Sequence, residues 1–249
     1  MTTGANRALL DAVGADLERR CAAVLVTRLP DSLGAETVEI LRSTLDDTDR
    51  ERHSEIQIAR SATAFLVTRA VVRTVLGHLL GLPGQNVELF TSERGKPSLA
   101  PSSVLPLYFN TSHSETRAVV ALSRVGDLGV DVEDIGPIDE RVVRRSVSSD
   151  EFERLATMDP DERARAFFHL WTIKEACAKA TGVGIGVGMR NIAATFDGSG
   201  WWNEYSWESI DLGPGLAAAL AIKSPEIGEG RISVALYHDV LNALLGIDA

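Results

Sequence analysis

The sequence predicts an α+β fold made of two comparable halves. Apolar residues at helical spacing occupy two long segments, Ala59–Leu80 in the first half and Asp161–Ala180 in the second. Short apolar and β-branched runs gather around each long segment. A regular alternation of strands and helices would instead indicate a doubly wound parallel sheet. We therefore expect two small sheets, each beside one long helix.

The first half is expected to contain one buried strand, three helices and further strands. Residues 1–20 form an irregular or helical extension, and the apolar run Cys21–Val26 is typical of a buried strand. A helix is expected over Gly34–Leu45, Asp46–Asp49 caps the next one, and Gly81–Gly84 ends the long helix. Further strands are predicted at Val87–Phe90, Leu107–Asn110 and Arg117–Leu122.

The second half begins with the cleanly alternating strand Leu128–Glu133. Short helices are predicted at Glu140–Arg145 and Asp150–Ala156, before the long helix. Strands of an antiparallel sheet are predicted at Ile192–Phe196, Tyr205–Ile210, Leu216–Ile222 and Ile232–Tyr237. The two halves are expected to join near Ser123–Gly126, which gives an N-terminal half of residues 1–124 and a C-terminal half of residues 125–249.

Composition excludes some classes of function without naming one. The chain has 249 residues, 45% hydrophobic and 24% charged, so it can bury a sizeable core. Its formal net charge of −10 argues against a general nucleic-acid binder, which needs a basic surface. Cys21 and Cys177 show no metal-type spacing and no disulfide framework. The N-terminal region lacks an unbroken apolar run, and the longest apolar runs are too short to span a bilayer, so we expect a soluble cytoplasmic protein.

The strand Gly129–Asp134 carries two acidic residues two positions apart. Residues two apart on a strand share a face, so Val130 and Val132 would enter the core while Asp131 and Glu133 stand roughly 7 Å apart on the other face. Carboxylates at that separation can converge on Mg²⁺, which prefers oxygen ligands. A half-exposed strand with an acidic solvent face explains the same pattern.

The helix Phe167–Ala180 carries charged residues between bulky apolar ones. Trp171, Glu175 and Lys179 share a side at helical spacing, and we place Lys174 along that side as well. Because apolar bulk surrounds these charges, they are expected to be enclosed and to need partners. Glu175 would then complete a three-carboxylate site. The alternative is an exposed stripe with an ordinary helical ion pair.

Three other polar segments have weaker signals. Asn110–Ser114 places hydroxyls beside an imidazole, so it can either bind phosphate or form a structural turn. Arg94–Pro97 is a turn with two cations, as many solvated loops are. Arginines also recur in the first half, at Arg50, Arg52, Arg60, Arg69 and Arg73. The glycine-rich run Gly182–Gly188 follows a helix and lacks the spacing of a nucleotide-binding loop, so Gly182 is interpreted as a helix-ending glycine.

In their order and spacing these segments resemble the 4′-phosphopantetheinyl transferases, of the larger type that activates surfactin synthetase and other nonribosomal peptide and polyketide synthases. The resemblance runs from about Cys21 to the C-terminus. Its most specific parts are Gly129–Glu133 and Trp171–Lys179, supported by Gly95–Pro97 and the Ser112–His113 pair. It implies two α+β halves related by a pseudo-twofold axis, with coenzyme A in the cleft between them.

The resemblance also implies roles for individual residues. The implied magnesium ligands are Asp131, Glu133 and Glu175. The implied contacts to coenzyme A are Arg60, Gly95, Lys96, Pro97, Ser112, His113, Lys174 and Lys179. The implied catalytic residues are Glu175, which would accept the proton of the attacking serine, and Lys179, which would add positive charge.

The implied reaction transfers the 4′-phosphopantetheine arm of coenzyme A to a serine of an acyl or peptidyl carrier protein, with Mg²⁺, and releases 3′,5′-adenosine diphosphate.

Carrier domains are acidic, so we expect a local basic patch to dock them. The residues predicted for this patch are Arg141, Arg144 and Arg145, with Val142, Val143 and Val147 as its apolar part. A monomer is expected, with no nucleic-acid or membrane partner. Two other readings are a non-catalytic coenzyme A binder and a magnesium-dependent nucleotide phosphohydrolase.

Overall fold

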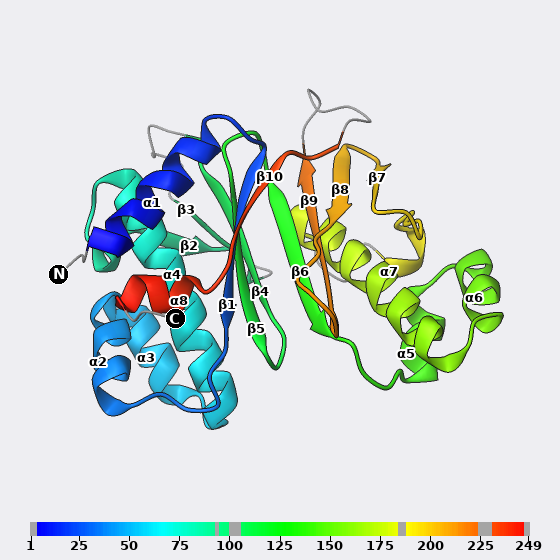
Figure 1. Cartoon of the computed structure of the whole chain (residues 1–249), viewed down its shortest axis with the longest axis horizontal. Coiled ribbons are helices and arrows are strands. Elements are labelled where there is room, and N and C mark those ends of the chain that lie inside the picture. Colours follow the sequence, from blue (N-terminus) through cyan, green and yellow to red (C-terminus); the bar gives the residue numbers. More distant parts are fainter. Residues whose placement is uncertain (1–3, 93–94, 100–105, 184–187, 224–230, 247–249) are drawn as a thin grey trace.

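Two four-stranded sheets face one another and helices cover their outer sides (Figure 1). The computed structural model describes residues 4–92, 95–99, 106–183, 188–223 and 231–246. The helices are α1 (Gly4–Leu17), α2 (Ala35–Ser43), α3 (Asp47–Glu55), α4 (Ala59–Leu80), α5 (Glu140–Ser146), α6 (Ser149–Ala156), α7 (Pro160–Ala180) and α8 (Val240–Leu245), with 3₁₀ turns η1 (Gly84–Asn86) and η3 (Met189–Asn191). The strands are β1 (Ala22–Arg28), β2 (Leu89–Thr91), β3 (Pro97–Leu99), β4 (Tyr108–His113), β5 (Arg117–Ser123), β6 (Leu128–Asp134), β7 (Ser199–Trp202), β8 (Tyr205–Ser209), β9 (Leu216–Lys223) and β10 (Val234–Tyr237).

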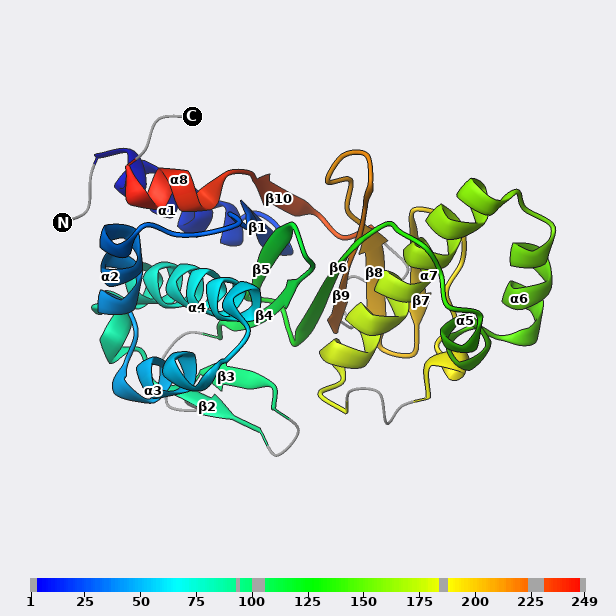
Figure 2. The same cartoon turned by 90° about the horizontal axis from the view of Figure 1, so that it is seen from below.

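Each half joins one sheet to one long helix, which confirms the α+β prediction. The first sheet has the order β10-β1-β5-β4 and packs on α4, and the second has the order β6-β9-β8-β7 and packs on α7. Strands β2 and β3 form a separate hairpin in the first half. In the view from below, α4 and α7 lie on opposite outer sides of the paired sheets (Figure 2).

The inner faces of the two sheets share one apolar layer. Alternate residues of β1, such as Val24, meet alternate residues of β6, such as Val130 and Val132, and all three are nearly inaccessible to solvent. The other face of β1, with Leu25, packs toward α4. This follows from the period of two along a strand, which lets one strand serve two cores.

The C-terminal segment differs from the prediction. Strand β10 does not join the second sheet but pairs in parallel with β1, and Val240 of α8 enters the core of the first half. The C-terminal half predicted over residues 125–249 is therefore wrong for its last two elements. The strand predicted at Ile192–Phe196 is also wrong, because that segment follows η3 as irregular chain and the edge strand is β7 instead.

The N-terminal extension is a helix with a definite place. Leu10, Val13 and Leu17 of α1 are buried in the core of the first half. Its far end is tied to β10, because the Tyr237 hydroxyl donates a 2.6 Å hydrogen bond to Asp16 Oδ2. Segments from the two ends of the chain thus close the same side of the first sheet (Figure 1).

Helix α4 is the only helix among the described residues that is long and apolar enough to cross a bilayer. In the fold, 61% of its apolar window is buried. Its apolar length is explained by contact with the first sheet, since Leu66, Val67 and Val71 are almost fully enclosed.

Candidate active site

Strand β6 lies between β4 and α7 (Figures 1 and 2), and β6 and α7 carry the predicted residues Asp131, Glu133, Glu175 and Lys179. Gly129 allows this close approach: a Cβ at that position would overlap the backbone of Ala176 and Ala180 on α7. With β6 held against α7, the alternation along the strand turns Asp131 and Glu133 away from the inter-sheet core. Both then meet side chains of α7.

Lys179 links the three elements. Its Nζ lies 2.6 Å from Asp131 Oδ1 and 2.9 Å from Ser112 Oγ, and it donates to the Val130 carbonyl at 3.2 Å. Ser112 donates in turn to Asp131 Oδ1 at 2.8 Å. Asp131 is buried, and its Oδ2 has no hydrogen-bond partner within the described parts of the chain. One oxygen of this carboxylate is thus held in place while the other stays free.

Two glutamates surround this pair. Burial raises the pKa of both Glu133 and Glu175, and the charge of Asp131 raises them further. Trp171 partly opposes this at Glu133, since its Nε1 donates a 3.2 Å hydrogen bond to Glu133 Oε1. Three carboxylates that act on one another's protonation form a site that favours a cation.

No group of three or more His, Cys, Asp or Glu side chains in the described ranges is arranged to hold a metal ion. The Lys179 ammonium instead serves as the cation at Asp131. The donor set still fits a hard cation, because carboxylate oxygens are the ligands that Mg²⁺ prefers and Asp131 Oδ2 is uncommitted.

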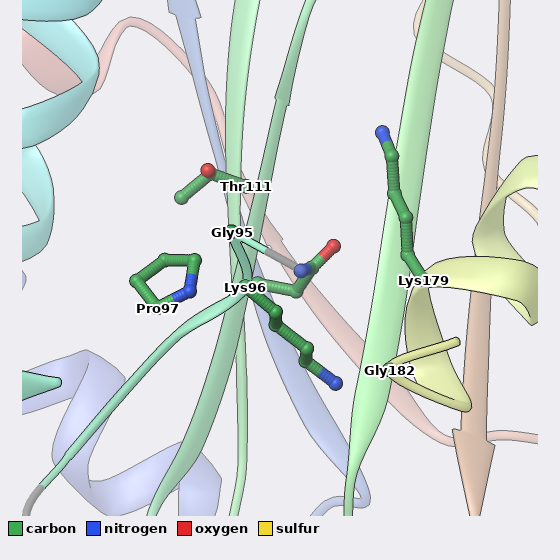
Figure 3. A pocket seen from close by; sticks show the side chains of 7 residues that line it. Gly95, Lys96, Pro97, Thr111, Lys179 and Gly182 are labelled. Carbon is green, nitrogen blue, oxygen red and sulfur yellow. The ribbon is translucent and has the colours of Figure 1, made fainter. Parts of the chain in front are cut away.

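A cavity of about 260 Å³ opens beside this network, between the two halves. The lining residues are Gly95, Lys96, Pro97, Asn110, Thr111, Lys179 and Gly182. Lys96 approaches from the first half and Lys179 from the second (Figure 3). The cavity therefore has cations on two sides and backbone of the β2–β3 hairpin on a third.

Lys96 spans the gap between the halves. Its Nζ donates to the carbonyls of Leu128 at 3.2 Å and Ala180 at 3.4 Å, and lies 3.5 Å from Asp127 Oδ1. Burial lowers the pKa of Lys96, and the nearby Asp127 charge partly offsets that effect. The hairpin is thus anchored to β6 and to the end of α7.

Comparison with known proteins agrees with this geometry. Residues 127–206 match the model of the 4′-phosphopantetheinyl transferase superfamily, and residues 34–124 match that of the 4′-phosphopantetheinyl transferase N-terminal domain. The chain is 30% identical over 161 residues to the 4′-phosphopantetheinyl transferase HetI of a Nostoc species. The matched stretch covers 64% of this chain and 68% of that protein. It is 28% identical over 208 residues to the 4′-phosphopantetheinyl transferase Sfp of Bacillus subtilis, a match that covers 83% of this chain and 88% of that protein. It is also 28% identical over 178 residues to psf-1 of Bacillus pumilus, over 72% of this chain and 75% of that protein.

The chain belongs to the 4′-phosphopantetheinyl transferase superfamily. It is accordingly a transferase, and the cavity between its halves is its candidate active site. The family resemblance drawn from the sequence is confirmed.

Lys174 of this phosphopantetheinyl transferase does not lie at the site, which corrects the prediction. It is fully buried, pairs with Glu151 at 3.0 Å, and donates to the carbonyls of Met189 and Ile192. Successive helical residues point about 100° apart, so Lys174 turns toward α6 and η3 while Glu175 faces β6. Lys174 is a structural cation of the transferase.

Arg60 also lies apart from Lys96 and Lys179. Its guanidinium pairs with Asp31 at 3.1 Å and donates to the Glu115 carbonyl, and it lines a different cavity. His113 is an exposed residue at the end of β4. Desolvation of its ring lowers the pKa of His113, and the charge of Lys179 adds to this effect.

The arginines of the first half mostly have structural partners. Arg73 is buried against Asp49 and Asp46 and donates to the Val87 carbonyl at 2.9 Å. Arg69 pairs with Asp49 at 3.2 Å. Arg94, half of the predicted two-cation turn, lies outside the described residues, as does most of the glycine run after Gly182.

The predicted carrier-docking segment is partly buried. Val143 and Val147 belong to the core under α5 and α6, which corrects their assignment to an apolar docking surface. Val142 is 38% exposed, and Arg144 and Arg145 are exposed. Because Arg141 is exposed as well, the outward face of α5 keeps one apolar and three basic residues.

Two supporting residues of the transferase were not singled out for their contacts from sequence. Asn110 accepts a hydrogen bond from the Val130 backbone at 3.0 Å and so fastens β4 to β6. Trp171 stands next to the carboxylates, and its bond to Glu133 has no sequence signature beyond its helical spacing from Glu175.

Proposed function

We propose that this transferase moves the 4′-phosphopantetheine arm of coenzyme A to a serine of an acyl or peptidyl carrier protein, and that Asp131, Glu133 and Glu175 hold Mg²⁺ for this reaction. The serine oxygen forms a bond to the β-phosphorus, and the bond from that phosphorus to 3′,5′-adenosine diphosphate breaks. The observation that carries the proposal is the Lys179–Asp131 pair at the edge of the cavity between the halves, beside two glutamates whose pKa values are raised.

The metal would supply charge neutralisation for the phosphate oxygens and the developing leaving group. Oxygen ligands and an uncommitted Asp131 Oδ2 support this assignment. Trp171 would hold Glu133 in its orientation, because their hydrogen bond fixes one carboxylate oxygen.

Glu175 is the proposed acceptor of the serine proton. Its pKa is raised by burial and by the charge of Asp131, and a carboxylate with a raised pKa is a stronger base near neutral pH. Glu175 and Lys179 are four residues apart on α7, so base and cation face the same region.

Lys96 and Lys179 are the proposed partners of the coenzyme A phosphates, since they line the cavity from opposite sides (Figure 3). Gly95 and Pro97 would border the adenine beside them. Ser112 would act mainly by orienting Lys179 and Asp131, with which it forms hydrogen bonds. His113 would meet the 3′-phosphate from the end of β4.

The remaining expectations stay part of this proposal. The cavity lies between halves of one chain, which supports a monomer. A net charge of −10 speaks against nucleic-acid partners. The two cysteines are free, which suits a cytoplasmic protein without a membrane partner.

The test is the intact mass of an apo carrier protein after incubation with the transferase, coenzyme A and Mg²⁺. We expect a gain equal to one phosphopantetheine arm, lost with Glu175→Gln and kept with Glu153→Gln, which alters an exposed glutamate of α6. No gain with several carrier types would contradict the proposal. Hydrolysis of coenzyme A without a carrier would instead assign a phosphohydrolase.

A further inference from the structure

A second, larger cavity lies at the end of the inter-sheet layer, where β1 and β6 end and β5 begins (Figure 1). Its volume is about 930 Å³, within the size range of small-molecule sites. It shares no lining residue with the cavity that contains Lys96 and Lys179. It is therefore a separate candidate site.

Two arginines lie side by side on the wall of this cavity. Arg28 and Arg117 are direct cross-strand partners on β1 and β5. Arg28 has the same strand parity as Val24 and Val26, and Arg117 the same as Val119, so both point into the inter-sheet space. Like charges directly opposite on one face of a sheet destabilise it, so this pair calls for an anion.

The described part of the chain provides no such anion. The only polar contact of the Arg117 guanidinium there is a 3.0 Å bond to the Thr116 carbonyl, and Arg28 forms no ion pair. Three carboxylates line the cavity, but Asp31 pairs with Arg60 and Asp134 accepts two hydrogen bonds from Thr116.

The third carboxylate, Asp239, also leaves the two arginines unpaired. It lies at the start of α8 with a left-handed backbone, φ 51°. No ion pair joins it to either guanidinium within the described ranges. The positive charge at the wall is thus uncompensated by the cavity's own acids.

We propose that this cavity binds a phosphate-bearing small molecule through Arg28 and Arg117. A phosphate monoester carries nearly two negative charges and can accept bonds from both guanidiniums at once. The walls also include Leu29, Leu216 and Leu241, which offer apolar contact to the organic part of the ligand. This inference is independent of the proposed transfer reaction.

The test uses phenyl phosphate as the probe and the full chain saturated with coenzyme A, so that the first cavity is occupied. Isothermal titration calorimetry should show binding to wild type. Arg28→Gln and Arg117→Gln should each weaken it about tenfold, the loss of one charge-assisted interaction. Arg28→Lys should weaken it less, because it keeps the charge but loses the planar fork.

Arg20→Gln, which alters an exposed arginine after α1, is the matched control and should leave the affinity unchanged. Arg28 is itself exposed, so its replacement is expected to fold, and thermal unfolding checks this. Absence of binding to the wild type, or unchanged affinity in both Gln variants, would overturn the proposal. Equal affinity for benzoate would overturn the assignment to a phosphate.

Discussion

The ammonium of Lys179 and the carboxylate of Asp131 form a 2.6 Å ion pair at the junction of α7 and β6. The Asp131 side chain is 5% exposed and that of Lys179 27%. The pair therefore has an enclosed acid that depends on its partner, and a cation with access to the cavity.

Lys179→Met should lower the free energy of unfolding by about 2 kcal/mol, below the usual loss for a fully buried pair because Lys179 is partly solvated. Mg²⁺ should then stabilise the variant more than the wild type, since a divalent ion can replace the missing charge. Urea unfolding with and without Mg²⁺ measures this. Lys223→Met, which removes an exposed pair with Glu204, should leave the free energy of unfolding almost unchanged. An equal effect of Mg²⁺ on Lys179→Met and wild type would count against a metal at Asp131.

His113 should make the protein less stable in mild acid. Its folded-state pKa lies below the ordinary value of 6.5, through desolvation first and the charge of Lys179 second. Between the two pKa values the unfolded chain binds more protons, so stability is complete above 6.5 and falls as pH decreases toward the folded pKa.

Urea unfolding from about pH 7 to about pH 5.5 measures this dependence. The difference between wild type and His113→Gln isolates the contribution of His113 from those of Glu133 and Glu175, whose pKa values are raised. We expect the wild type to lose more stability than the variant over this range. Parallel curves would mean that the ring titrates alike in both states.

Lys174→Met tests the corrected position of this lysine. It leaves Glu151 without its buried partner, so we expect a loss of about 3–5 kcal/mol in the free energy of unfolding. The KM for coenzyme A should stay within about twofold, because Lys174 faces η3 and not the cavity. The double variant Lys174→Met/Glu151→Gln should recover part of the loss. A large rise in the KM for coenzyme A with unchanged stability would instead support the contact between Lys174 and coenzyme A that the sequence predicted.

The fold class was predictable from local patterns, but the sheet partners were not. Helical and strand periodicity is set by which residues are buried, and α4, α7 and β6 follow it. Strand β10 has an equally good pattern, yet its partner β1 lies at the other end of the sequence. The apolar run from Ile192 looked like a strand because Ile192 is buried against α7, and burial does not require strand pairing.

The candidate site was likewise predictable only in part. The period of two predicted that Asp131 and Glu133 share a face, and helical spacing predicted that Glu175 and Lys179 do. Lys174 was misplaced because an adjacent helical residue was assigned to the same side. Its partners, from α6 and η3, are brought together only by the tertiary fold.

The outward face of α5 should contact the carrier protein. Arg144 lies over the Phe152 ring at 4.5 Å, and Arg145 and Val142 are exposed beside it, while Arg141 is engaged by Asp139 at 2.9 Å. A basic, partly apolar helix face suits an acidic partner, because complementary charge speeds and orients docking. Neither Arg144 nor Arg145 forms an ion pair with another described residue, so both can meet an acidic partner.

Reversing both charges, Arg144→Glu with Arg145→Glu, should raise the KM for an acidic carrier about tenfold or more and leave the KM for coenzyme A unchanged. Steady-state kinetics with each substrate varied in turn measures the two values, and the effect on carrier should shrink at high salt. The matched control reverses Arg19 and Arg20, two exposed arginines between α1 and β1 in the first half of the chain. A similar rise in carrier KM from the control would mean that net charge, and not the α5 face, governs docking. Equal effects of Arg144→Glu/Arg145→Glu on both substrates would place the damage in the active site instead.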